Sequence, residues 1–254
     1  MSFSSAIYIS SSFFFFEVRL ELNSIAWDSI LCLKDVSAES LELKLFNEIV
    51  STKISNRRNN TKIKTKNHLV FVEHNSVYTL GKSGEINNLL INENDLKTKK
   101  IKFFKTNRGG DITYHGPGQL VCYPILDLDN FFTDIHKYLR CLEETVILTL
   151  KDFKISGERS ENETGVWLNP NSADARKICA LGVKASRWVT MHGLALNVNN
   201  DLSFFNHIIP CGIKNKSITS ISVECNNNIE MELVKEKIIN NFLKVFSAKQ
   251  NNLI

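Results

Sequence analysis

The chain has 254 residues, of which 43% are hydrophobic and 23% charged, a composition typical of a globular protein with one large domain or two small ones. A formal net charge of +4 is too small to indicate nucleic-acid binding, although it suits an acidic protein partner. The six cysteines contain no CxxC pair, so the sequence indicates neither a zinc site nor a disulfide framework, and a reducing cytosol is the expected compartment.

The N-terminus carries an apolar and hydroxyl-rich stretch, Ile7 to Phe16, with no basic residue before Arg19 and no clear cleavage site after it. The stretch is also shorter than the roughly 20 residues that span a bilayer. We therefore expect residues 1–23 to be an upstream start-codon extension or an edge strand, rather than a targeting signal. The expected organisation is a single domain over residues 24–247, with a frayed tail over 248–254.

An amphipathic helix is predicted from Ala38 to Val50. Its apolar positions are Leu41, Leu45, Phe46 and Ile49, and its polar side holds Glu39, Glu42, Lys44 and Glu48. The following stretch, Lys53 to Lys66, is basic and contains no acidic residue, which favours a solvated loop. The alternative is a basic patch that steers an acidic partner.

Short apolar runs and longer periodic segments predict an α/β (α+β) fold, with strands in a sheet and amphipathic helices that pack on it. The expected strands are His68–Val72, Val77–Leu80, Ile101–Lys105, Val121–Leu128, Gly165–Leu168, Lys177–Val183 and Leu194–Val198, and Arg187 to Gly193 separates the last two. The expected helices are Phe132–Leu150, Leu202–Ile208 and Met231–Phe246, with a short helix or turn over Leu89–Leu96. His136 lies beside the apolar stripe of the first of these helices and is interpreted as a surface or structural residue.

The loop from Asn107 to Leu120 holds four of the eleven glycines and one of the four prolines. Such a backbone turns tightly and lets another group approach closely. Because buried strands flank the loop on both sides, we interpret it as the wall of a binding site.

Cys211 is the one cysteine placed between a proline and a glycine, a setting that exposes a side chain at a corner. As a nucleophile it would need a cation or a base nearby, since free cysteine is mostly protonated at neutral pH. Lys177, which opens an apolar strand, is a candidate cation, and His115 and His192 compete as the base. On these grounds alone, a small buried hydrophobic role for Cys211 stays open, as do capping or core roles for the two histidines.

Four segments resemble the octanoyltransferases of lipoate biosynthesis, in matching order along the chain. They are Arg108–Gln119 (RGGDITYHGPGQ), Arg176–Val183 (RKICALGV), Met191–Asn197 (MHGLALN) and Ile209–Ile213 (IPCGI). The resemblance extends from about Leu41 to about Phe246. It implies the fold shared with biotin and lipoate protein ligases, a mixed sheet surrounded by helices with a central acyl tunnel.

The resemblance also implies roles for individual residues. Cys211 matches the acyl-thioester nucleophile and Lys177 the lysine that tunes it. The matches to substrate-binding positions are Arg108, Gly109, Gly110, Asp111, Ile112, Thr113, Tyr114, His115, Ala180, Leu181, Gly182, Gly193, Leu194 and Ala195. Where the family often has a proline between a serine and a phenylalanine, this chain reads Ser203-Phe204, which puts only local helix geometry in doubt.

The implied reaction moves an octanoyl group from octanoyl-acyl carrier protein to a lysine of a lipoyl domain, in 2-oxoacid dehydrogenase complexes and in the glycine cleavage H protein. No metal or other cofactor, nucleic acid or membrane is expected to take part, and the implied location is the cytoplasm. One alternative is an ATP-dependent lipoate or biotin ligase on the same fold, which needs no nucleophilic cysteine. Another is a lipoyl-domain binder without turnover.

Overall fold

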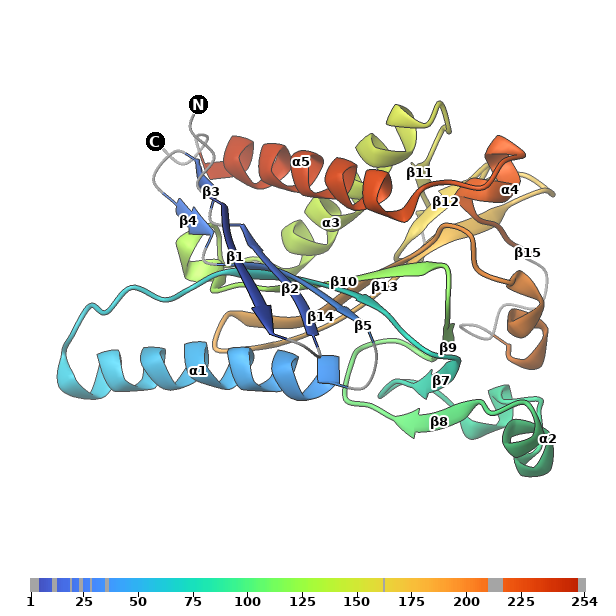
Figure 1. The fold of residues 1–254 in the computed structure, drawn as a ribbon, viewed down its shortest axis with the longest axis horizontal. Coiled ribbons are helices and arrows are strands. Elements are labelled where there is room, and N and C mark those ends of the chain that lie inside the picture. Colours follow the sequence, from blue (N-terminus) through green and yellow to red (C-terminus); the bar gives the residue numbers. More distant parts are fainter. Residues whose placement is uncertain are drawn as a thin grey trace.

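The computed structural model describes residues 5–10, 13–18, 20–22, 25–27, 29–34, 37–161, 163–209 and 217–250. A large mixed sheet runs through the middle of the molecule in the order β11-β12-β13-β14-β10-β6-β5, and β15 pairs with β13 (Figure 1). Its strands are β5 (Ser29–Lys34), β6 (His68–Glu73), β10 (Gln119–Ile125), β11 (Glu158–Arg159), β12 (Val166–Leu168), β13 (Arg176–Ser186), β14 (Val189–Asn197) and β15 (Ser217–Ile218). The β5–β6 and β13–β15 pairs are parallel, and the other neighbours are antiparallel.

Helices cover both faces of this sheet (Figure 1). Helices α3 (Ile135–Asp152) and α5 (Met231–Gln250) pack against each other and bury one face in the largest apolar cluster. Helix α1 (Ser37–Asn59) lies on the opposite face, where its Leu45, Phe46 and Ile49 enter a second cluster. The predicted apolar stripes are therefore the faces that these helices bury.

A smaller sheet of three strands, in the order β8-β7-β9, lies beyond the end of α1 (Figure 1). It consists of β7 (Val77–Leu80), β8 (Lys102–Lys105) and β9 (Ile112–His115), and it shares a third apolar cluster with α2 (Glu93–Thr98) and the 3-10 turn η3 (Leu202–His207). The remaining elements are β1 (Ser5–Ser10), β2 (Phe13–Val18), β3 (Leu20–Leu22), β4 (Ile25–Trp27), η1 (Ile86–Asn88), η2 (Leu128–Asn130) and α4 (Ile221–Cys225).

The N-terminal stretch, expected as an extension or an edge strand, forms β1 and β2, which pair antiparallel in a sheet of their own. The division of the chain at residues 23 and 247 stays a prediction, and α5 continues past Phe246 to Gln250. No helix among the described residues is long and apolar enough to cross a membrane.

The structure corrects the interpretation of Lys53 to Lys66 as one solvated loop, because α1 continues to Asn59. The Lys53 ammonium is held between the carboxylates of Asp127 and Asp129, which anchors this part of the helix to the end of β10. Arg57 and Arg58 lie in the last turn, where positive charge interacts favourably with the helix dipole. Only residues 60–66 are irregular.

A second correction concerns Arg187 to Gly193, which was expected to separate two strands. Strand β14 begins at Val189, and only Arg187 and Trp188 form the turn of a β13–β14 hairpin. Both residues have positive φ angles, 51° and 64°, as a two-residue hairpin turn requires. The usual turn residues, asparagine and glycine, are absent here, so the sequence carried no hairpin signal.

Candidate active site

A cavity of about 990 Å³ lies between the large sheet and the small sheet. Strands β10, β13 and β14 line it on one side, and β7, β8 and β9 on the other. Val121 and Ala195 belong both to the cavity wall and to the apolar cluster under α1. Helix α1 covers one part of this face of the large sheet, and the small sheet covers another part. The cavity therefore lies between the large sheet and the small sheet, on the same face as α1.

Small residues on two neighbouring strands leave room for this cavity. Across the β13–β14 pair, Ala180 is opposite Ala195 and Gly182 is opposite Gly193, and all four residues line the cavity. Residues two apart on a strand share a face, so these four form one patch of the cavity wall without a large side chain. An elongated apolar group has space to lie against such a wall.

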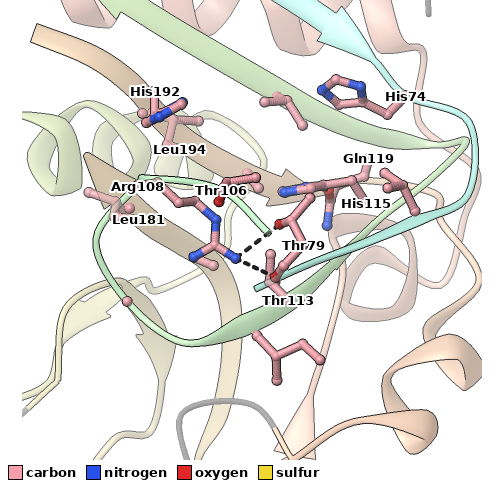
Figure 2. Close-up of a pocket in the computed structure, with 18 of the residues that line it drawn as sticks. His74, Thr79, Thr106, Arg108, Thr113, His115, Gln119, Leu181, His192 and Leu194 are labelled. Atoms are coloured by element: carbon pink, nitrogen blue, oxygen red, sulfur yellow. Dashed lines mark hydrogen bonds between the residues drawn. The ribbon is translucent and has the colours of Figure 1, made fainter. Parts of the chain in front are cut away.

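The glycine-rich loop is fixed to both sheets. The Gly109 amide donates to the Val183 carbonyl at 3.0 Å, and a Cβ on Gly182 would lie only 2.9 Å from the Gly109 carbonyl oxygen. Figure 2 shows the Arg108 guanidinium reaching Thr79 of β7, where its Nη2 donates to the carbonyl oxygen at 2.7 Å and to Oγ1 at 2.9 Å. The loop therefore bridges the two sheets at one end of the cavity.

His115 is buried in a chain of hydrogen bonds that runs under the cavity. Its Nδ1 lies 2.7 Å from Gln119 Oε1, and Gln119 Nε2 donates in turn to Asn197 Oδ1 at 2.9 Å. Because a side-chain carbonyl oxygen only accepts, His115 Nδ1 is the donor, which leaves Nε2 as an acceptor. Burial, with a contribution from the nearby His74, lowers the pKa of His115 to about 3, so this histidine is neutral at physiological pH.

His192 is held by Glu42 of α1, which the helical pattern had placed on the solvent side. Glu42 is instead 1% exposed. One carboxylate oxygen accepts the His192 backbone N–H, and the other lies 3.3 Å from His192 Nδ1. His192 has a positive φ of 59°, and its Nε2 lies 3.2 Å from Asn107 Oδ1 in the glycine-rich loop. Glu42 therefore orients both the backbone and the ring of a histidine in the cavity wall.

Lys177 also lines the cavity and is 9% exposed. Its ammonium lies over the Trp167 ring, 4.5 Å from the centroid, and it makes no ion pair with any residue that the structure describes. Two positions along β13, Cys179 is fully buried, and burial raises the pKa of its thiol. Cys179 is therefore unsuited to be a nucleophile.

Of the other residues carried over from the resemblance, all but two line this one cavity: Arg108 to Thr113, His115, Ala180 to Gly182 and Gly193 to Ala195 are in its wall. Tyr114 is the first exception, since its ring stacks on Phe204 with 4.7 Å between centroids and its hydroxyl lies 3.0 Å from Ser76 Oγ. Cys211 is the second, because it lies outside the described residues, as does the expected corner at Pro210-Cys211-Gly212. Among the described residues, no group of three or more His, Cys, Asp or Glu side chains is arranged to hold a metal ion.

Residues 44–243 match the family described as lipoyl protein ligase A/B catalytic domain. The octanoyltransferase of Christiangramia forsetii is 62% identical over 206 residues, which cover 81% of this chain and 88% of that protein. The octanoyltransferase of Flavobacterium psychrophilum is 60% identical and that of Cytophaga hutchinsonii 52% identical, covering 81% and 83% of this chain and 89% and 88% of those proteins. This chain belongs to the octanoyltransferase family.

Solved structures agree on the fold of this family member. A putative lipoate protein ligase from T. acidophilum superposes with a TM-score of 0.62 at 16% identity, over 86% of this chain and 84% of that one. Lipoate-protein ligase A with bound ATP gives 0.62 at 17% identity, over 86% and 85% of the two chains. A biotin protein ligase from Aquifex aeolicus gives 0.51 at 12% identity, over 89% and 73%. The expected mixed sheet of the biotin and lipoate ligase type is confirmed.

Sequence reasoning missed several residues of this octanoyltransferase cavity, above all Glu42, His74, Gln119, Tyr123 and Asn197. Gln119 had been quoted as the end of a motif, without a role. His74 Nε2 lies 2.8 Å from the Tyr123 hydroxyl, so these two residues form a further polar pair in the wall. Alternation along β10 and β14 would have placed Gln119, Tyr123 and Asn197 on one face, but their strands pair only in the folded sheet.

Proposed function

We propose that this octanoyltransferase works through a thioester on Cys211, taking the octanoyl group from acyl carrier protein and giving it to a lysine of a lipoyl domain. The observation that carries the proposal is the Lys177 ammonium, buried in the cavity wall without an ion-pair partner among the described residues. A buried cation is costly unless an anion neutralises it. A cysteine thiolate in the same cavity would be that anion.

Residues on both sides of Cys211 support its assignment to this cavity. The Ile209 amide donates to the Asn88 carbonyl at 2.8 Å, and Asn88 also bonds Asp111 of the glycine-rich loop. After the segment that contains Cys211, Ser217 and Ile218 pair with Arg176 and Lys177 across β15 and β13. The described residues on either side of Cys211 are therefore attached to this site, through Asn88 to Asp111 before it and at Lys177 after it.

In the first half-reaction the Cys211 thiolate attacks the carbonyl carbon of the octanoyl thioester. A new carbon–sulfur bond forms, the bond to the sulfur of the carrier breaks, and the carrier leaves as a thiolate that takes up a proton. Because one thioester replaces another, the step needs no ATP. The Lys177 ammonium favours the attacking thiolate by direct charge interaction.

In the second half-reaction the deprotonated amine of the lipoyl-domain lysine attacks the octanoyl-Cys211 carbonyl. A carbon–nitrogen bond forms, the bond to Cys211 breaks, and the proton of the attacking amine passes to Cys211 through Lys177. The product amide is more stable than the thioester, which drives transfer forward. His115, neutral at the pH of the reaction, is available to accept a hydrogen bond at Nε2, and it carries no charge that would compete with Lys177.

The proposed acceptors are the lipoyl domains of 2-oxoacid dehydrogenase complexes and the glycine cleavage H protein, and the proposed location is the cytoplasm. The thiols support that location, because Cys122, Cys141, Cys179 and Cys225 are all free. Free thiols persist where the surroundings are reducing.

Intact-mass measurement after incubation with octanoyl-acyl carrier protein tests the thioester. The protein should gain one octanoyl group, which peptide mapping places on Cys211, and Cys211→Ser should lose both the adduct and the transfer. Cys225→Ser is the matched control, since Cys225 is free and lies outside the cavity wall, and it should keep both. Transfer at the normal rate by Cys211→Ser, or its use of free octanoate with ATP, would instead indicate a ligase.

A further inference from the structure

The segment from Lys97 to Lys105 carries five lysines in nine residues and no acidic residue. We call Lys97, Lys99, Lys100, Lys102 and Lys105 the basic strip. The strip begins in the last turn of α2 and continues through β8, one of the two outer strands of the small sheet. All five side chains are exposed, and none forms an ion pair within the described part of the chain. The strip is therefore an uncompensated positive surface.

The basic strip lies at the cavity. Lys99, Lys100 and Lys102 line it, together with Phe104, whose side chain is 49% exposed. The mouth of the cavity thus combines positive charge with one large apolar side chain. Partner proteins commonly bind where an aromatic side chain lies within a charged rim.

An edge strand often carries lysines simply to prevent pairing with another chain. That explanation accounts for Lys102 and Lys105, which lie on β8. It does not account for Lys97, Lys99 and Lys100, which precede the strand, or for the position of Lys99 and Lys100 in the cavity wall. Binding of a molecule that approaches the cavity explains all five lysines of the basic strip.

The other basic stretch of the chain is in the wrong place for such a role. Arg57 and Arg58 are exposed at the C-terminal end of α1, whereas Glu42 near the other end of the helix lines the cavity. Figure 1 shows the C-terminal end of this long helix at the left edge of the molecule and its N-terminal end near the middle, with β8 and α2 beyond the N-terminal end. Of these two basic stretches, only the basic strip is at the cavity.

We infer that the basic strip is the docking surface for the acyl carrier protein that donates the octanoyl group, an inference that rests on the function proposed above. The acyl group of the carrier is attached to an arm that a phosphodiester links to the protein. The phosphodiester anion therefore reaches the mouth of the cavity before the acidic surface of the carrier does. Lys99, Lys100 and Lys102 neutralise that charge as the thioester passes inward. The acceptor offers a lysine amine, whose cationic form the same lysines repel, so the strip favours the donor over the acceptor.

Charge reversal separates the two half-reactions. In the Lys99→Glu/Lys100→Glu/Lys102→Glu variant, acylation of Cys211 is measured with octanoyl-acyl carrier protein and with the uncharged donor octanoyl-N-acetylcysteamine. The ratio of the carrier rate to the small-thioester rate should fall about tenfold at low ionic strength, and the difference should shrink as salt is added. Transfer from pre-formed octanoyl-enzyme to a lipoyl domain is measured in parallel and should not fall, because the substitutions remove a repulsion toward the acceptor amine.

The matched control is Arg57→Glu/Arg58→Glu/Lys62→Glu, which makes the same change in net charge on exposed residues at the far end of α1. It should leave the ratio near that of the unmodified enzyme. An unchanged ratio in the strip variant, an equal loss in the control, or a loss confined to lipoyl-domain transfer would each overturn the inference.

Docking is also measured without turnover, as the affinity of octanoyl-acyl carrier protein for the Cys211→Ser variant with and without the three strip substitutions. Weaker binding only with the substitutions supports the inference, and equal affinity contradicts it. If octanoyl-acyl carrier protein fails to acylate Cys211 in the unmodified enzyme, the proposed function is wrong, and this binding measurement still decides whether the strip docks the carrier.

Discussion

At the scale of single residues, the contact between Glu42 and His192 joins positions 150 residues apart. A carboxylate that is 1% exposed needs partners, and Glu42 has two from one residue, the backbone N–H and the ring Nδ1 of His192. The left-handed backbone of His192 is strained for a residue other than glycine. The Glu42 contacts hold that conformation and direct the ring toward Asn107.

Glu42→Gln should lower kcat for octanoyl transfer by about tenfold with little change in KM, because a neutral amide oxygen holds the backbone N–H but no longer attracts the His192 ring as a carboxylate does. Steady-state kinetics on purified protein measure this effect. Glu48→Gln, an exposed position on the same helix, is the control and should change neither constant. A Glu42→Gln enzyme with normal kcat would show that His192 needs no orientation from α1.

The sequence predicted the helix that carries Glu42 but assigned Glu42 itself to the solvent side. Helical periodicity counts apolar positions, and a carboxylate on the border of the apolar stripe looks like any surface acid until its partner is known. The partner is on β14, where the sequence also gave no sign that His192 has a positive φ. Lys177 was easier to single out, because a lysine within an apolar strand is anomalous in the sequence alone.

At the scale of elements, the position of the glycine-rich loop depends on β13. The hydrogen bond from the Gly109 amide to the Val183 carbonyl requires the loop to lie directly over Gly182. Gly110, with a φ of 85°, then turns the chain back toward Asp111, whose backbone carbonyl accepts from the Gly81 amide at 3.2 Å. The glycines of the segments Arg108–Gln119 and Arg176–Val183 therefore pack against each other, and neither segment alone reveals this contact.

Gly182→Ala should reduce octanoyl transfer by about tenfold or more, since the new Cβ would lie 2.9 Å from the Gly109 carbonyl oxygen and push the loop away from the cavity. The rate of Cys211 acylation by octanoyl-acyl carrier protein measures it. Gly157→Ala is the control, because its Cβ would lie 2.7 Å from a Leu150 methyl group under α3, away from the cavity. The control should lose stability but keep its acylation rate, and the same pattern in Gly182→Ala would exclude the proposed loop displacement.

Most elements were predictable from the sequence because buried strands and amphipathic helices have distinct periods. The predictions failed where tertiary contacts decide the backbone. Ion pairs of Lys53 with Asp127 and Asp129 extend α1 into a polar stretch, and Arg187 and Trp188 make a hairpin turn without turn-forming residues. In both places the favourable interactions come from other parts of the chain.

At the scale of the whole molecule, the cavity is assembled from segments between residues 42 and 218. Most residues of the cavity wall were identified only because their motifs resemble a known family. The spacing of residues along the chain does not by itself show that β7, β10, β13 and β14 come together. The assembly also encloses a chain of buried polar groups from His115 through Gln119 to Asn197, whose Nδ2 donates to the Thr219 carbonyl at 3.0 Å. This chain links the small sheet to the large one.

The buried His115 should make folding stability fall with acid. Its pKa of about 3 in the folded protein lies below the value of about 6.5 for an unfolded histidine, so the unfolded chain binds a proton first as the pH falls. The contribution is fully present above about pH 6.5 and is lost on acidification, by about 2 kcal/mol near pH 5, at roughly 1.4 kcal/mol per pH unit.

Urea unfolding between about pH 7 and pH 5 should therefore show a shallower loss of stability for His115→Gln than for the unmodified protein, whatever the starting stability of the variant. His136→Gln, at an exposed position on α3, serves as the control and should keep the original slope. Equal slopes for His115→Gln and the unmodified protein would mean that His115 gains its proton in the folded state, and that the cavity wall holds a positive charge at His115 in addition to that of Lys177.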